Sequence, residues 1–152
     1  FGYMIKNGAT SIWERWEADT DNNIMNSRNQ PMLAAVCVWF YKYLGGIRPV
    51  RSKDGLEKLY IEPVIPQKLN QVDVEMDICN GHVKSSWEKR EDKLVLRISV
   101  PFNTEAQIIL RNKYGQVKEA TQNGQKLQMS KTSDSNKTIY QGGNGDYYFV
   151  LQ

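Results

Sequence analysis

From residue 56 to its end, the chain alternates apolar and polar residues in short runs, and this period of two constrains the fold more than any other feature. Such alternation is typical of strands with one face in a core and the other in water. The clearest runs span 72–78, 94–100, 106–110 and 147–151, with turn residues between them. We therefore expect a mostly β fold, with seven or eight short strands in an antiparallel β-sandwich.

The stretch 31–44 has a different pattern and predicts a short helix before the sandwich. Its apolar residues recur at three- and four-residue spacing, which puts them on one face of a helix, and further apolar residues cover much of the rest of the helix surface. Pro31 suits the first helical position, Asn29 is the expected cap before it, and Gly45 and Gly46 end the helix. A helix that is apolar on nearly all sides should either pack on the sandwich or drive association with another copy.

The chain divides near residue 47 into a helical part and a strand-rich part. We expect domains at 1–47 and 48–152, with residues 1–6 forming the end of another helix that stops at Asn7 and Gly8. The chain opens with Phe1 and not with Met, and a short segment offers few partners for such an apolar helix. The sequence is therefore expected to be part of a longer protein, and no signal peptide is expected at its start.

Rare residue types and missing motifs exclude several functions. A net charge of +3 indicates no nucleic-acid partner, and no apolar run approaches the roughly 18 residues of a membrane span. Two cysteines and one histidine without a CxxC pair are too few ligands for a structural zinc site, so we expect no metal and no cofactor. His82 is expected in a surface turn that leads into a strand. Cys37 is expected as a small core residue, with no specific argument for a disulfide to Cys79.

The run Trp13-Glu14-Arg15-Trp16 is the strongest candidate for chemistry. It places one carboxylate between two indole rings, which can desolvate the carboxylate and make it a better base. Indole faces also stack on sugar rings, so the composition is typical of a carbohydrate-cleaving site. A structural interpretation stays open, in which Ser11 caps a helix and Glu14 is its reciprocal capping-box partner. Trp13 and Trp16 would then be core residues on one helix face.

Several motifs together resemble the bacterial α-L-rhamnosidases. These are Asn-Gly-Ala-Thr-Ser-Ile-Trp-Glu-Arg-Trp at 7–16, Met-Asn-Ser-Arg-Asn-Gln-Pro-Met at 25–32, Trp-Phe-Tyr-Lys-Tyr-Leu-Gly-Gly-Ile at 39–47 and Leu-Tyr-Ile-Glu-Pro at 59–63. The resemblance implies an inverting glycoside hydrolase in which a six-hairpin (α/α)6 barrel precedes a small C-terminal β-sandwich. Residues 1–47 would be the end of that barrel.

The same resemblance implies roles for individual residues. Glu14 corresponds to the general base that activates water, whereas the general acid lies upstream and nothing here corresponds to it. Trp13 or Trp16 is expected to form an apolar wall against the sugar. Asn29 and Gln30 occupy the place of an Asn-His pair whose histidine faces the sugar; Gln30 can donate a hydrogen bond to a hydroxyl but carries no positive charge.

The implied partner is a rhamnose-containing glycan or glycoside, cleaved at terminal α-L-rhamnosyl residues. The chain alone is expected to be inactive because it contains only one of the two carboxyl groups that glycoside hydrolysis requires. The alternative is a non-catalytic carbohydrate-binding or purely structural sandwich. Binding would need an exposed aromatic platform such as Trp87 or Tyr148, and the pattern favours a core position for Trp87. The compartment is left open, with periplasmic or secreted slightly favoured.

Overall fold

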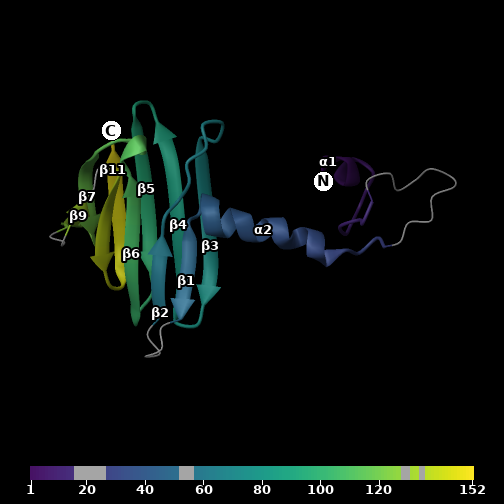
Figure 1. Cartoon of the computed structure of the whole chain (residues 1–152), viewed down its shortest axis with the longest axis horizontal. Coiled ribbons are helices and arrows are strands. Elements are labelled where there is room, and N and C mark those ends of the chain that lie inside the picture. Colours follow the sequence, from purple (N-terminus) through teal and green to yellow (C-terminus); the bar gives the residue numbers. More distant parts are fainter. Residues whose placement is uncertain (16–26, 52–56, 128–130, 134–135) are drawn as a thin grey trace. The chain divides into compact units, whose positions relative to one another are not determined.

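The computed structural model describes residues 1–15, 27–51, 57–127, 131–133 and 136–152 (Figure 1). They form two compact units, Phe1–Trp39 and Phe40–Gln152. In the first unit, helix α1 (Gly2–Lys6) ends at Asn7, whose side-chain amide donates to the Tyr3 carbonyl at 2.8 Å. Gly8 follows with φ +71°, a conformation that favours glycine. The predicted helix end is therefore confirmed.

The predicted helix at 31–44 is helical throughout but changes its winding along its length. A 3₁₀ turn, η1 (Pro31–Ala35), is followed by one α turn, α2 (Val36–Trp39), and by a π turn, η2 (Phe40–Leu44). The N-cap is Gln30 and not Asn29 as expected, and no side chain caps this end. Gly45 closes the π turn, because its N–H donates to the Phe40 carbonyl at 2.9 Å.

Most apolar side chains of these three turns are exposed, as their sequence predicted for a helix with too few partners. Met32 is 79% exposed and Val38 61%, whereas Leu44 at the end of η2 is buried. Cys37 is exposed rather than a core residue, so that expectation is wrong. It fails because η1 and α2 bury none of their side chains. Cys37 and Cys79 are both free thiols.

The second unit is a β-sandwich of two stacked sheets, and the axes of the strands are roughly aligned with one another (Figure 1). The five-stranded sheet has the order β1 (Ile47–Arg51), β2 (Glu57–Ile61), β6 (Thr104–Arg111), β10 (Lys137–Gly142), β9 (Lys131–Ser133). The six-stranded sheet has the order β3 (Gln71–Ile78), β4 (Gly81–Arg90), β5 (Lys93–Val100), β11 (Gly145–Leu151), β7 (Val117–Gln122), β8 (Gln125–Lys126). A 3₁₀ turn, η3 (Asn112–Tyr114), follows β6.

Alternating residues of both sheets fill the core, as the period of two predicted. The fully buried side chains include Leu59, Ile61 and Ile108 from one sheet and Val83, Ile98 and Phe149 from the other. The rings of Tyr140 and Phe149 meet across the two sheets with centroids 5.0 Å apart. All four runs identified from the sequence lie in strands, namely β3, β5, β6 and β11. The sandwich is thus the expected fold.

Three details differ from the expectation. The described residues contain eleven strands, because β1 precedes the region with the period of two and because β8 and β9, of two and three residues, show no such period. Pro63 and Pro66 predict an edge or an entry segment for the strand before them, but this strand, β2, lies inside its sheet; the edge is β1, whose Pro49 suits that position. Finally, β2 pairs in parallel with β6, because the chain crosses to the other sheet for three strands before it returns.

Candidate active site

Two segments of the first unit, 11–15 and 27–30, lie side by side. The Glu14 N–H donates to the Ser27 carbonyl at 3.0 Å, and the Gln30 N–H donates to the Ile12 carbonyl at 2.7 Å. These bonds bring the segment that carries Glu14 next to the one that carries Gln30. Two stretches that the sequence predicted to share a site, far apart in the chain, are therefore neighbours. Trp16 lies outside the described residues.

The capping-box interpretation of Glu14 is wrong. Residues 11–15 are not helical, so no helix begins at Ser11. The Ser11 hydroxyl donates instead to the Arg28 carbonyl, and the Glu14 N–H that a capping serine would bind is bonded to Ser27. The Glu14 side chain is half-buried and has no capping-box role, because no helix starts here.

Trp13 anchors this segment. It is 5% exposed and packs in a small cluster with Met4, Ala9 and Ile12. The Arg28 guanidinium lies over its ring, 5.6 Å from the centroid, in a cation–π arrangement. A buried indole next to Glu14 fixes the backbone from which the carboxylate projects.

The other two predicted site residues lie at the start of the helical turns. Asn29 is exposed, and its N–H donates to the Ser27 hydroxyl oxygen at 3.1 Å. The same hydroxyl donates to the Asn29 carbonyl at 3.0 Å. Gln30 is half-buried at the N-cap position, and its side chain makes no capping bond there. Ser27, which the sequence analysis did not single out, thus holds both Glu14 and Asn29 in place.

The sandwich offers a weaker candidate for sugar binding. Trp87 is 1% exposed and is a core residue, as predicted, so it provides no platform. Tyr148 is half-buried, and the Arg97 guanidinium lies 5.6 Å from its ring centroid. Beside it is a cavity of about 480 Å³ that Ser99 and Asp146 also line. The Ser99 hydroxyl donates to an Asp146 carboxylate oxygen at 2.7 Å.

His82 is exposed, as predicted, but it is the second residue of β4 and lies in the strand that follows the turn at Cys79 and Asn80. Its Nδ1 is 2.8 Å from an Asp77 carboxylate oxygen, and its Nε2 is 3.3 Å from Glu75. The hydrogen bond with Asp77, and secondly that with Glu75, raises the pKa of His82 above its ordinary value of 6.5. The ring is exposed and belongs to a surface charge network with Lys84, which donates to Glu75 at 2.6 Å.

Two other kinds of site are absent from the described ranges. No group of three or more His, Cys, Asp or Glu side chains there has a geometry that could hold a metal ion. Among the same residues, no helix has the length and apolar character needed to cross a membrane.

Comparison with family models gives two adjacent matches. The bacterial alpha-L-rhamnosidase 6 hairpin glycosidase domain matches residues 1–44. The bacterial alpha-L-rhamnosidase C-terminal domain matches residues 46–125. The boundary between the two matches falls between η2 and β1.

Individual relatives agree with these matches. The chain is 29% identical over 143 residues to an alpha-L-rhamnosidase of Formosa agariphila, a similarity that covers 93% of this chain and 15% of that protein. It is 31% identical over 112 residues to an alpha-L-rhamnosidase of Alteromonas sp. (strain LOR), covering 70% of this chain and 12% of the relative. The chain therefore spans only a small part of the length of these curated relatives.

Solved structures show the same similarity. The alpha-L-rhamnosidase from Dictyoglumus thermophilum matches with a TM-score of 0.78 and 30% identity, over 99% of this chain and 17% of that one. The Streptomyces avermitilis alpha-L-rhamnosidase complexed with L-rhamnose matches with a TM-score of 0.73 and 25% identity, over 99% of this chain and 14% of that one.

Proposed function

The chain belongs to the bacterial α-L-rhamnosidase family, and from this premise we propose that it is the C-terminal part of an inverting glycoside hydrolase that removes terminal α-L-rhamnosyl residues. Its partner would be a rhamnose-containing glycan or glycoside. Residues 1–47 would be the end of the (α/α)6 barrel and residues 48–152 the sandwich. The two family matches, which meet between residues 44 and 46, support this division.

One observation carries the proposal. The segment with Glu14 is held beside the segment with Gln30 by backbone hydrogen bonds, and neither residue's side chain serves as a helix cap. Both segments fall within the match to the six-hairpin glycosidase domain. A half-buried carboxylate on a braced segment, beside the segment that carries Gln30, suits a base that must be held close to a sugar.

In the proposed mechanism, Glu14 is the general base. A water molecule lies between its carboxylate and the anomeric carbon, on the face opposite the leaving group. Glu14 takes a proton from this water as the oxygen attacks, while an acid from the upstream part of the barrel protonates the glycosidic oxygen. Inverting enzymes place the two carboxyl groups roughly 6.5–9.5 Å apart, which leaves room for the water.

The remaining site residues would bind the sugar. Asn29 and Gln30 would hydrogen-bond its hydroxyl groups. Gln30 is neutral and stands where the family has a histidine, and this difference bears on which sugar is preferred. The apolar wall is proposed for Trp13 or Trp16. The packing of Trp13 against Met4 favours a supporting role for this residue, because little of its ring is accessible.

Replacing Glu14 by Gln in the longer hydrolase tests the base assignment. The variant keeps the shape and hydrogen-bonding capacity of the side chain but cannot accept the proton. We expect turnover of an aryl α-L-rhamnoside to be lost, with the melting temperature unchanged. Glu105→Gln, which changes an exposed carboxylate of β6, is the matched control and should retain full activity. Hydrolysis retained by Glu14→Gln would refute the assignment.

The 152-residue chain by itself is expected to be inactive, because the resemblance places the general acid outside it. Incubation with the same rhamnoside should give no product above that of the chain with Glu14→Gln. Product formed in excess of that variant would mean that a second carboxyl group of this chain acts as the acid.

The second candidate function is carbohydrate binding by the sandwich, favoured by the cavity beside Tyr148. Calorimetric titration of the chain with L-rhamnose would detect it. Binding that is lost in Tyr148→Ala, and retained in Glu14→Gln, would place a sugar site on the sandwich. Binding that is lost only in Glu14→Gln would assign the sugar to the first unit instead.

A further inference from the structure

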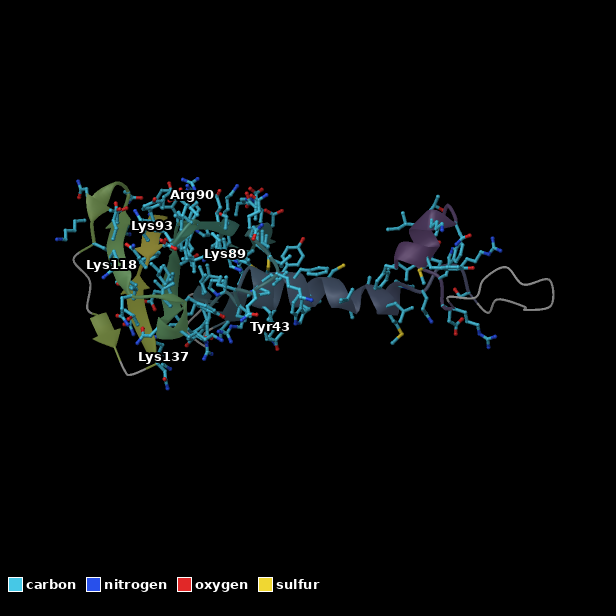
Figure 2. All side chains as sticks on the ribbon, turned by 90° about the horizontal axis from the view of Figure 1, so that it is seen from above. Tyr43, Lys89, Arg90, Lys93, Lys118 and Lys137 are labelled. Carbon is cyan, nitrogen blue, oxygen red and sulfur yellow. The ribbon has the colours of Figure 1, made fainter. Side chains whose placement is uncertain are left out.

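Four successive backbone carbonyls link the end of η2 to the sandwich. The Tyr43 carbonyl accepts from the Val64 N–H at 2.8 Å, and the Leu44 carbonyl accepts from the Trp87 indole N–H at 2.9 Å. Figure 2 labels Tyr43 where the helical turns meet the strands.

The next two carbonyls continue the series. The Gly45 carbonyl accepts from the Ser85 hydroxyl at 2.7 Å, and the Gly46 carbonyl accepts from the Glu62 N–H at 3.0 Å. A helix end leaves its last carbonyls without intrahelical partners, and such groups must find donors elsewhere when they are buried. Here the sandwich supplies a donor to each of the four residues in turn.

The two side-chain donors of this set come from one strand and are among the most buried side chains of the molecule. Ser85 and Trp87 are both 1% exposed and lie two residues apart on the inner face of β4. Ser85 is one of only a few polar residues in the described core. A serine in that position needs an acceptor, and without the Gly45 carbonyl its hydroxyl would be buried unpaired at a cost of stability.

The two glycines permit the close approach. A Cβ atom on Gly45 would lie 2.9 Å from Val74 Cβ, and one on Gly46 would lie 2.3 Å from the Pro63 nitrogen. Gly46 also has φ +71°, in the left-handed region. Sterically, therefore, only glycine brings these carbonyls within reach of the donors.

This arrangement lies at the junction of the two family matches, since one ends at residue 44 and the other begins at residue 46. We propose that the sandwich is the C-terminal cap of the helical segment and that Ser85 and Trp87 are the positioning residues that fix η2 on it. That η2 belongs to a hydrolase domain rests on the proposed function, whereas the cap itself does not. Trp87 thereby has a structural assignment in place of the sugar platform considered for it.

Amide hydrogen exchange on the 152-residue chain tests the cap. The double variant Ser85→Ala with Trp87→Phe removes both donors and keeps an aromatic ring in the core. We expect the Gly45 N–H, which closes the π turn on the Phe40 carbonyl, to exchange about tenfold faster, together with the other η2 amides. The amides of β11 should change only as far as overall stability changes.

A second double variant, Thr138→Val with Tyr147→Phe, is the matched control. It removes two buried hydroxyl groups from the same sandwich, and these donate elsewhere, to Asn112 and to the Gly143 carbonyl. Gly45 exchange that is equally fast in both double variants would overturn the proposal. If the first double variant fails to fold, Ser85→Ala alone should still exchange faster at Gly45 than Thr138→Val alone, and equal rates would again overturn it. Neither readout depends on catalysis, so this experiment and the Glu14→Gln test can fail independently.

Discussion

At the residue scale, Glu62 is a largely buried carboxylate of the sandwich that pairs with two arginines. Its side chain is 13% exposed and lies between two arginines, pairing with Arg48 and, at 2.5 Å, with Arg111. These pairs tie the end of β2 to β1 and β6. A carboxylate so enclosed needs its two cationic partners, because it is largely shielded from water itself.

We predict that Glu62→Gln lowers the free energy of unfolding by about 1–2 kcal/mol, a value reduced from that of a fully buried pair because both arginines are partly exposed. Urea unfolding of the chain measures it. The control is Glu105→Gln, whose exposed partner Lys58 is 3.3 Å away, with an expected loss below about 0.5 kcal/mol. Equal losses in the two variants would contradict the prediction.

His82 predicts a pH dependence of stability. Its pKa is raised in the folded chain, first by Asp77 and then by Glu75, so folding favours the protonated ring. This stabilisation is complete below the unfolded pKa of about 6.5 and is lost as the pH rises through the higher folded value. Wild type should therefore melt above His82→Gln near about pH 5.5, and the two melting temperatures should converge by about pH 8.5. A difference that grows toward alkaline pH would have the wrong sign.

The residues of the candidate site show what could be predicted from the sequence. Glu14 stood out because it lies between two tryptophans and because the run around it resembles a family motif. Both signals come from neighbouring residues in the sequence. The sequence could not show that Ser27 and Arg28 would accept the hydrogen bonds of Glu14 and Ser11, because those contacts join residues 13 or more positions apart. The same limit applies to Glu62, because its partner Arg111 lies 49 residues further along the chain, in β6.

At the element scale, the glycine pair after η2 gives the sharpest prediction. Gly46→Ala should lower the free energy of unfolding by about 2–4 kcal/mol, since the new Cβ would meet the Pro63 nitrogen and the residue would keep a left-handed φ. Chemical denaturation of the chain measures the loss.

Gly124→Ala is the matched control for that substitution. Gly124 has a similar φ of +76°, but no heavy atom of the described residues lies within 4 Å of the place that a Cβ would occupy. This substitution should therefore add only backbone strain and lower the free energy of unfolding by about 1 kcal/mol. If Gly46→Ala were no worse than Gly124→Ala, close packing at this junction would be ruled out.

Strands with a clear period of two were predictable because burial on one face decides their pattern. β3, β5, β6 and β11 are of this kind. Val95 illustrates the limit, because it lies on the outer face of β5 and yet is buried. The register places Val150 beside it on β11, and two adjacent apolar side chains shield each other from water. The π winding of η2 was not predicted either, because the spacing of its apolar residues indicated an ordinary helix, whereas the Gly45 N–H donates to the Phe40 carbonyl five residues back.

At the scale of the whole molecule, the exposed apolar side chains of η1 and α2 predict self-association. The chain should sediment as a concentration-dependent mixture of monomer and dimer. Val38→Lys should weaken the dimer by roughly tenfold, since Val38 would lose about 1.5 kcal/mol of burial. Sedimentation velocity over a range of concentrations measures the association constant of the wild-type chain and of Val38→Lys.

Phe102→Lys provides the control, since Phe102 is equally apolar and even more exposed but lies on the sandwich. It should leave the association constant unchanged. A wild-type chain that stays monomeric at all concentrations would refute the prediction, as would a dimer that Phe102→Lys disrupts and Val38→Lys does not.

The parallel pairing of β2 with β6 has a consequence for how this protein is made. As the chain leaves the ribosome, β1 and β2 are the first strands of the sandwich to emerge and can form only a two-stranded ribbon, which is marginal in water. Their next neighbour is about 45 residues further along, after three strands committed to the opposite layer. The edge of β2 that pairs with β6 must therefore stay without its hydrogen-bond partner until residues 104–111 have emerged. During synthesis, that interval is when a chaperone has the most to protect.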